Sequence, residues 1–244
     1  MNRDSNGYTF GFAAAMVLVV ASVLAFTASS LKDLQAENVR KEKMQNILST
    51  IGIKTDREGA EKLFNTYIVE QLALRNDGSV DDAVDAFTDI KLAIEIKKDA
   101  NYQRFPLYVA NVDAATYYII PLRGAGLWNA IWGYIALNED KNSIKGVVFD
   151  HQGETAGLGA EITQQWFMNR FVDEKIFDKS GDLVGISVSK TNNDPNDTDK
   201  EDHEVDAISG ATITGDGVSD MIIERLQHYL PYLKATPADL AYNN

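Results

Sequence analysis

The fold of this chain is decided by the stretch LWNAIWGYIAL at residues 127–137. Its aromatic, apolar and β-branched residues predict one continuous buried strand. A polar turn follows at residues 138–142, and the run IKGVVFD at residues 144–150 then has the pattern of an antiparallel partner. Three more strands are predicted, two upstream at residues 106–112 and 115–122, and one downstream at residues 183–189.

Predicted helices lie on both sides of the central strands, at residues 34–51, 56–74, 81–87, 161–171 and 217–233. Central strands with helices before and after them, and without alternation of strand and helix, predict an α+β fold. Its mainly antiparallel sheet would be flanked by helices. We expect four parts: a membrane anchor at residues 1–32, a mainly helical stalk with the start of the soluble domain at 33–100, a ligand-binding domain at 101–234, and a tail at 235–244.

The N-terminal segment is apolar enough to cross a membrane. Residues 5–31 carry no charged side chain, and residues 10–28 form the apolar centre. About 20 apolar residues span a hydrocarbon layer roughly 30 Å thick. A cleaved signal peptide is the alternative, but the apolar run is longer than usual, Arg3 is balanced by Asp4, and no clean Ala-x-Ala site follows. We therefore expect one uncleaved transmembrane helix.

The charges around this segment bear on its orientation. Arg3 precedes the span, whereas four basic residues follow it closely, namely Lys32, Arg40, Lys41 and Lys43. Taken alone, this count predicts that the large domain lies in the cytoplasm.

Composition excludes several classes of function. The net charge of −13 argues against nucleic acid or an anionic membrane surface as a partner. No cysteine is present, so disulfides, thiolate nucleophiles and cysteine-ligated metals are excluded. The three histidines are far apart in sequence and form no metal motif. The polar loop at residues 192–204 lacks the glycine and the final glutamate of a calcium loop. Neither a dinucleotide fingerprint nor a Walker phosphate loop occurs. We expect no metal and no catalytic residue.

The stretch DAISGATITG at residues 206–215 combines small and hydroxyl residues just before a predicted helix. The N-terminus of a helix offers unpaired N–H groups and a positive dipole end, which favour a phosphate. Gly210 and Ala211 would let a ligand approach the backbone. The alternative is a polar turn that caps the helix, with Thr214 or Asp216 as the N-cap.

A second candidate segment is HQGETAGLGAE at residues 151–161, between a predicted strand and a predicted helix. Its glycines would lay backbone and one apolar side chain against a flat ring. The candidate contacts are Glu154, Thr155, Gly157, Leu158 and Gly159, and Trp128 of the Gly-Leu-Trp-Asn run could edge the same ring. The alternatives are an ordinary glycine-rich turn and a core tryptophan.

The order of anchor, Gly-Leu-Trp, Glu-Thr-Ala-Gly-Leu-Gly and Ser-Gly-Ala-Thr resembles the C subunits of sodium-translocating NADH:quinone reductases. The resemblance covers nearly the whole chain, although Ala156 stands where proline is usual. It implies an FMN-binding domain in which the FMN phosphate is joined as a phosphoester to Thr212. Thr214 is the nearest rival acceptor and Ser209 the next, and Lys190 is a further candidate contact.

The resemblance also implies a role and a place. The chain would be a single-pass subunit of the bacterial inner membrane, with its soluble domain in the periplasm. It would relay electrons among the other subunits, without an NADH or quinone site of its own, in a complex that couples quinone reduction to Na⁺ export. A separate flavin transferase would attach the FMN. The alternatives are the G subunit of the related Rnf ferredoxin:NAD oxidoreductase and a non-redox membrane-anchored scaffold.

Overall fold

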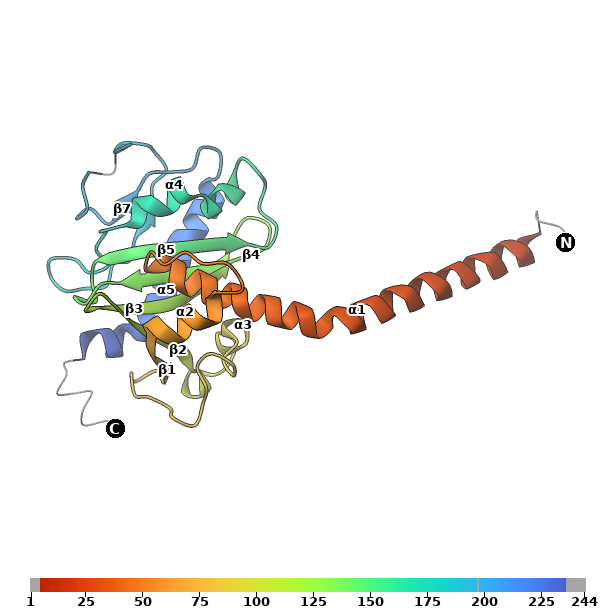
Figure 1. Ribbon diagram of the computed structural model, residues 1–244. Coiled ribbons are helices and arrows are strands. Elements are labelled where there is room, and N and C mark those ends of the chain that lie inside the picture. Colours follow the sequence, from red (N-terminus) through yellow and green to blue (C-terminus); the bar gives the residue numbers. More distant parts are fainter. Residues whose placement is uncertain (1–4, 197, 236–244) are drawn as a thin grey trace. The chain divides into compact units, whose positions relative to one another are not determined.

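A five-stranded sheet in the order β1-β2-β3-β4-β5 forms the centre of the fold (Figure 1). Each strand pairs with the next in antiparallel fashion. The structure is a computed structural model and describes residues 5–196 and 198–235. The strands are β1 (Ile68–Leu74), β2 (Phe105–Val112), β3 (Ala115–Ala125), β4 (Ala130–Leu137) and β5 (Ile144–His151). A separate parallel pair consists of β6 (Ser187–Val188) and β7 (Glu204–Val205). The α+β prediction is confirmed.

Both faces of the sheet are covered, which explains why its strands are apolar throughout. Alternate residues of β3 serve different cores: Ile120 packs with the residues of helix α5 (Thr212–Lys234), whereas Ile119 packs with Leu48 and Phe64 on the opposite face. Helix α2 (Ala60–Tyr67) contributes Phe64 to that second core. The sheet is therefore the middle of three layers. Because α5 packs against one face of the sheet, the position of its N-terminus relative to the strands is fixed.

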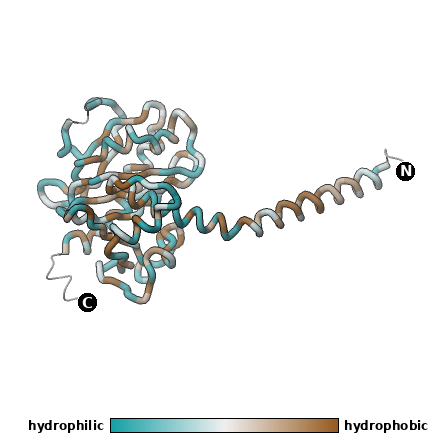
Figure 2. The backbone as a smooth tube through the Cα atoms, in the orientation of Figure 1, coloured by the Kyte–Doolittle hydropathy of each residue, from teal (hydrophilic) through white to brown (hydrophobic). Residues whose placement is uncertain are grey.

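Helix α1 runs without interruption over Asn6–Thr50. By length and composition it is able to cross a membrane, and it is the one helix of this kind among residues 5–196 and 198–235. Figure 2 shows the apolar residues gathered in its N-terminal half and a hydrophilic stretch after them. The chain divides into two units between residues 43 and 44, so the last residues of α1 belong to the core of the second unit. Residues 236–244 of the expected tail lie outside the described residues.

Several predicted elements were wrong in extent. The helix expected at 56–74 ends at Tyr67, because the next seven residues pair with β2 as the edge strand β1. Residues 81–87 form turns, in which the Asp85 carboxylate accepts backbone N–H bonds from Phe87 and Thr88. The strand expected from 127 begins at Ala130, because a tight turn with a Gly126 N–H bond to the Asn129 carbonyl precedes it.

The C-terminal half shows similar differences. The helix expected at 161–171 is broken into η2 (Gly159–Thr163), α4 (Gln165–Met168) and η3 (Asn169–Phe171). The strand expected at 183–189 is reduced to β6. The last helix starts at Thr212, five residues earlier than predicted, so the predicted N-caps Thr214 and Asp216 lie inside it. Two short helices, α3 (Leu92–Glu95) and η1 (Ala100–Tyr102), complete the described elements.

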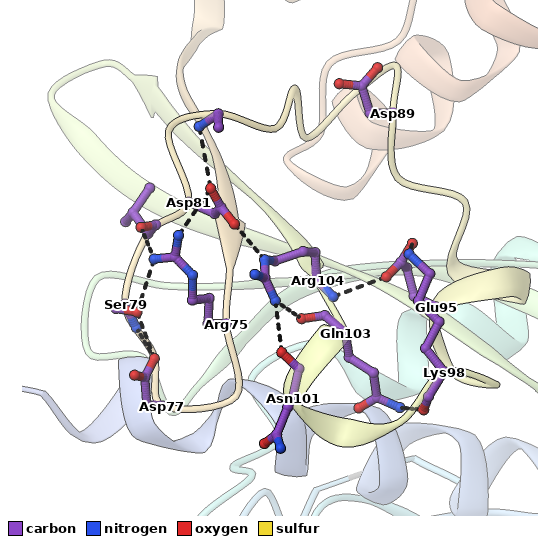
Figure 3. A network of polar contacts seen from close by, with 12 residues as sticks. Arg75, Asp77, Ser79, Asp81, Asp89, Glu95, Lys98, Asn101, Gln103 and Arg104 are labelled. Carbon is purple, nitrogen blue, oxygen red and sulfur yellow. Dashed lines mark hydrogen bonds and ion pairs between the residues drawn. The ribbon is translucent and has the colours of Figure 1, made fainter.

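A network of ion pairs and hydrogen bonds joins residues within the long connection between β1 and β2 (Figure 3). The Asp81 carboxylate is bound by the guanidinium groups of Arg75 at 3.0 Å and Arg104 at 2.6 Å. The Arg104 backbone N–H also donates to Glu95, whose other oxygen pairs with Lys98. The hydrogen bond from Arg104 lowers the pKa of Asp81, although partial desolvation opposes it. Residues 75–104 contain no helix or strand longer than four residues, so this network holds the segment in place.

Candidate functional site

Three chain segments meet at a pocket of about 230 Å³ at the N-terminus of α5. They are the β3–β4 turn, the glycine-rich segment after β5, and the first turn of α5 with the residues before it. The lining residues are Leu127, Glu154, Thr155, Leu158, Gly159, Gly210, Ala211, Thr212, Ile213 and Thr214. The volume is below the roughly 300–1,000 Å³ of typical small-molecule sites. A ligand of ordinary cofactor size would therefore remain partly exposed.

The Glu154 carboxylate holds these three segments together. Its Oε1 accepts the Trp128 backbone N–H at 2.9 Å, and its Oε2 accepts the Thr214 hydroxyl at 2.6 Å. Burial raises the pKa of Glu154, but the bonds from Thr214 and from the backbone of residues 127–129 outweigh burial and leave the pKa below its ordinary value. The residue is only 7% exposed. Glu154 is therefore an ionised carboxylate with a structural role, and both of its oxygens accept hydrogen bonds from within the protein.

Two threonines in the first turn of α5 differ in what they can do. Thr214 is 1% exposed and its hydroxyl is committed to Glu154. Thr212 is exposed, lines the pocket, and its hydroxyl has no hydrogen-bond partner among the described residues. The helical phase causes this difference, because residues two positions apart point about 200° away from each other around the axis. Thr212 is the accessible nucleophilic oxygen of the pair.

The N-terminus of α5 is open to an anion. Its N-cap residue, Ala211, makes no side-chain capping bond. The backbone N–H groups of Thr212, Ile213 and Thr214 bond to no acceptor in the described part of the chain, whereas the Gly215 N–H reaches the Ala211 carbonyl at 2.9 Å. Unpaired N–H groups at the positive end of a helix dipole favour a phosphate. The stretch before α5 is therefore not a conventional capping motif.

Glycines allow the segments to approach so closely. A Cβ on Gly159 would lie 2.4 Å from the Thr214 hydroxyl oxygen and 2.5 Å from Glu154 Oε2. Gly210 has a φ of +75°, which L side chains rarely adopt, and a Cβ there would meet Leu158 at 2.8 Å. One glycine in each motif, Gly159 and Gly210, is therefore explained by lack of space or by backbone conformation.

The rim of the pocket is apolar. Leu127, Leu158 and Ile213 are 46%, 40% and 58% exposed, respectively, and all three line it. Trp128 stands next to them with 67% exposure, and its indole N–H donates to the Thr155 hydroxyl at 3.1 Å. Exposed apolar side chains around a small pocket suit a flat ring that lies across its mouth.

Eight of the twelve predicted site residues line this pocket. Of the others, Trp128 is attached to it through Thr155, and Gly157 is nearby with its N–H bonded to Glu161 at 3.0 Å. Ser209 is exposed just before Gly210 but does not line the pocket. Lys190 lines a separate hollow, 72% exposed and 4.0 Å from the Asp216 carboxylate. Two further lining residues, Leu127 and Ile213, were not predicted from the sequence, although Leu127 precedes Trp128 and Ile213 follows Thr212 directly.

Comparison with known proteins gives a consistent match. The family model of the FMN-binding domain matches residues 126–227. The chain is similar to the C subunit of the Na⁺-translocating NADH-quinone reductase of Pseudomonas aeruginosa, at 31% identity covering 91% of each chain. It is 30% identical to the corresponding protein of Neisseria meningitidis, covering 95% of each. The crystal structure of the C subunit of the Na⁺-translocating NADH-quinone reductase from Parabacteroides distasonis matches with a TM-score of 0.75 and 37% identity, covering 84% of this chain and 98% of that one.

Proposed function

Because this chain belongs to the family of Na⁺-translocating NADH-quinone reductase C subunits, we propose that it carries FMN covalently on Thr212 and relays electrons within such a complex. It is an FMN-binding, membrane-anchored subunit of an NADH-quinone reductase. This family assignment replaces the alternative of the related Rnf G subunit. The open helix N-terminus argues against the alternative of a scaffold in which Ser-Gly-Ala-Thr is only a cap.

The observation that carries the proposal is the free, exposed hydroxyl of Thr212 beside unbonded N–H groups. A phosphoester at this oxygen would place its charged oxygens near the backbone donors of Ile213 and Thr214. The nearest rival oxygen, on Thr214, is buried and bonded to Glu154. The ten residues that line the pocket include no lysine or arginine, so the helix N-terminus has to supply the positive potential.

The residues around Thr212 fit the rest of FMN. Leu127, Leu158 and Ile213 form an apolar rim on which the ring would rest, with Trp128 at its edge. FMN supplies the electron chemistry, and the protein supplies position and electrostatics. A covalent link compensates for a shallow pocket, because the cofactor then cannot be lost by dissociation. Attachment by a separate flavin transferase is part of the proposal.

The attachment site is tested with the full chain coexpressed with a flavin transferase. We expect wild type, Ser209→Ala and Thr212→Ser to retain flavin fluorescence in a denaturing gel. Thr212→Val should lose it, because valine has a similar shape but no hydroxyl. Fluorescence that survives in Thr212→Val, or that is absent from the wild type, would overturn the assignment.

We also propose that the soluble domain faces the periplasm and that the complex couples quinone reduction to Na⁺ export. The family supports this orientation over the one that the flanking charges favour. Protease added to sealed cells should digest the domain while leaving a cytoplasmic marker intact. A domain that stays protected until the cells are opened would refute the orientation. Reconstituted complex should move ²²Na⁺ on addition of NADH and quinone, and transport of protons alone would refute the Na⁺ coupling.

A further inference from the structure

A second pocket lies against the same β3–β4 turn, and of its lining residues the function proposed above uses only Trp128, at the edge of the flavin ring. Its volume is about 450 Å³. Strand β3 contributes Arg123 to its wall and helix α5 contributes Glu224 and Arg225, while Trp128 and Asn129 come from the turn. The first pocket contains no basic residue, so the two differ in their electrostatic character.

Arg225 is a buried cation without full compensation. The residue is 8% exposed, and its Nη2 donates to the Glu224 carboxylate at 2.8 Å. Its Nε and Nη1 are buried and have no acceptor among the described residues. The Glu224 side chain is itself 59% exposed, so it offers only a partly hydrated counter-charge. A buried guanidinium with unmade hydrogen bonds is costly, and a carboxylate that entered the pocket would offset part of that cost by adding a second counter-charge.

Arg123 adds a second positive charge to the wall. It is half-buried, and within the described part of the chain its guanidinium makes no ion pair or hydrogen bond. Two arginines against one glutamate give the pocket a net positive charge, although the chain as a whole carries −13. The ligand that fits is therefore an anion, and the planar guanidinium group suits a carboxylate in particular.

The exposed tryptophan beside the arginines indicates that the anion belongs to a protein. Trp128 is 67% exposed and lines this pocket, and Leu127 beside it is 46% exposed. Tryptophan and arginine are the residue types that dominate binding energy at protein interfaces. The proposed flavin would meet only one edge of Trp128. A small free anion would satisfy the arginines but would leave the rest of the indole in water, whereas a protein surface would cover both.

We propose that this pocket receives the carboxylate of an acidic side chain from another subunit of the complex, with Trp128 packed beneath the same surface. The proposal rests on membership of a multi-subunit reductase and not on the attachment of FMN to Thr212. It places the contact at the turn whose backbone N–H groups hold Glu154, next to the candidate flavin site.

The test is recovery of the other subunits with a tagged full-length chain in cells that express the whole complex. Arg123→Glu and Arg225→Met should each lower recovery at least about tenfold, a change of roughly 1.4 kcal/mol or more. Arg57→Glu is the matched control for the change of charge, because Arg57 is exposed and lies outside the pocket. It should change recovery by less than about twofold. Thermal unfolding and gel fluorescence of each variant report fold and flavin separately.

If Arg225→Met proves unfolded, Arg123→Glu decides alone, because its side chain reaches solvent. Normal recovery of the complex with a folded Arg123→Glu would overturn the proposal. Inorganic phosphate and acetate are titrated against the full chain in detergent as probes of a small-anion site. An Arg123-dependent rise in melting temperature with either anion, together with unimpaired assembly of Arg123→Glu, would also overturn it in favour of a small-anion site. Loss of recovery with flavin fluorescence retained would support docking at this pocket.

Discussion

Substitution of Thr214 by valine removes one buried hydroxyl while almost preserving the volume of the side chain. The hydroxyl donates to Glu154 at 2.6 Å from a residue that is 1% exposed. A hydrogen bond to a charged group contributes about 1.5–3 kcal/mol. For a protein of this size each kcal/mol corresponds to roughly 2–4 °C in melting temperature. We therefore expect Thr214→Val to melt about 3–12 °C below the wild type at pH 7.

This loss should depend on pH in a defined direction. Burial raises the pKa of Glu154, but the hydrogen bonds from Thr214 and the turn outweigh it and hold the pKa below the ordinary 4.5. A carboxyl with a lowered folded-state pKa stabilises the fold above its unfolded pKa, and that contribution disappears as the pH falls through the folded value. The difference between wild type and Thr214→Val should thus be largest above about pH 5 and should shrink below it.

The measurement is thermal and urea unfolding of the full chain in detergent, followed by circular dichroism at pH 7 and pH 4. Thr212→Val is the matched control, since its exposed hydroxyl has no partner among the described residues, and its unfolding free energy should change by less than about 0.5 kcal/mol. Equal stability of wild type and Thr214→Val at pH 7, or an equal loss in both variants, would refute the reasoning.

Three other changes test separate parts of the structure. Gly159→Ala should lower the unfolding free energy by about 1–3 kcal/mol, because the new methyl group would clash with the atoms of the Thr214–Glu154 hydrogen bond. Gly153→Ala is the control: its methyl group would meet nothing within 4 Å, so the unfolding free energy should change by less than about 0.5 kcal/mol. Denaturant titration measures both. Arg104→Gln should raise the pKa of Asp81 towards its ordinary 3.8, because the hydrogen bond that lowers the pKa is lost, and an unchanged value in an NMR titration would contradict this. Deletion of residues 1–31 from the chain expressed without the other subunits should move the protein from the membrane pellet to the supernatant after ultracentrifugation, and persistence in the pellet would show that another part of the chain holds it there.

The strands of the central sheet were predictable because their runs of apolar and β-branched residues strongly favour the β conformation. The edge strand β1 was not, because the stretch before and through it has helical spacing as well as β-branched residues. Its pairing with β2, with Leu74 opposite Phe105, decides its conformation. That pairing is a long-range contact, which local propensity does not contain.

The start of α5 illustrates a different limit. The predicted helix began at Gly217, whereas the helix in the structure begins at Thr212 and contains both Gly215 and Gly217. Glycine is a poor helix former, but close neighbours explain its use here: a Cβ on Gly217 would lie 2.3 Å from the Ala125 carbonyl oxygen. The two motifs of the site were recognisable from sequence, but the burial of Thr214 and the exposure of Thr212 required the helical phase to be known.

The free hydroxyl of Thr212 has a consequence for the biogenesis of the protein. The Thr214–Glu154 bond already joins the segments of the site, so the pocket does not depend on a cofactor for its assembly. A modifying enzyme can reach an exposed oxygen at the start of α5 without unwinding the helix. If FMN is attached to Thr212 as proposed, attachment would be a finishing step on a folded precursor, and cells that lack the transferase should accumulate a colourless but folded chain.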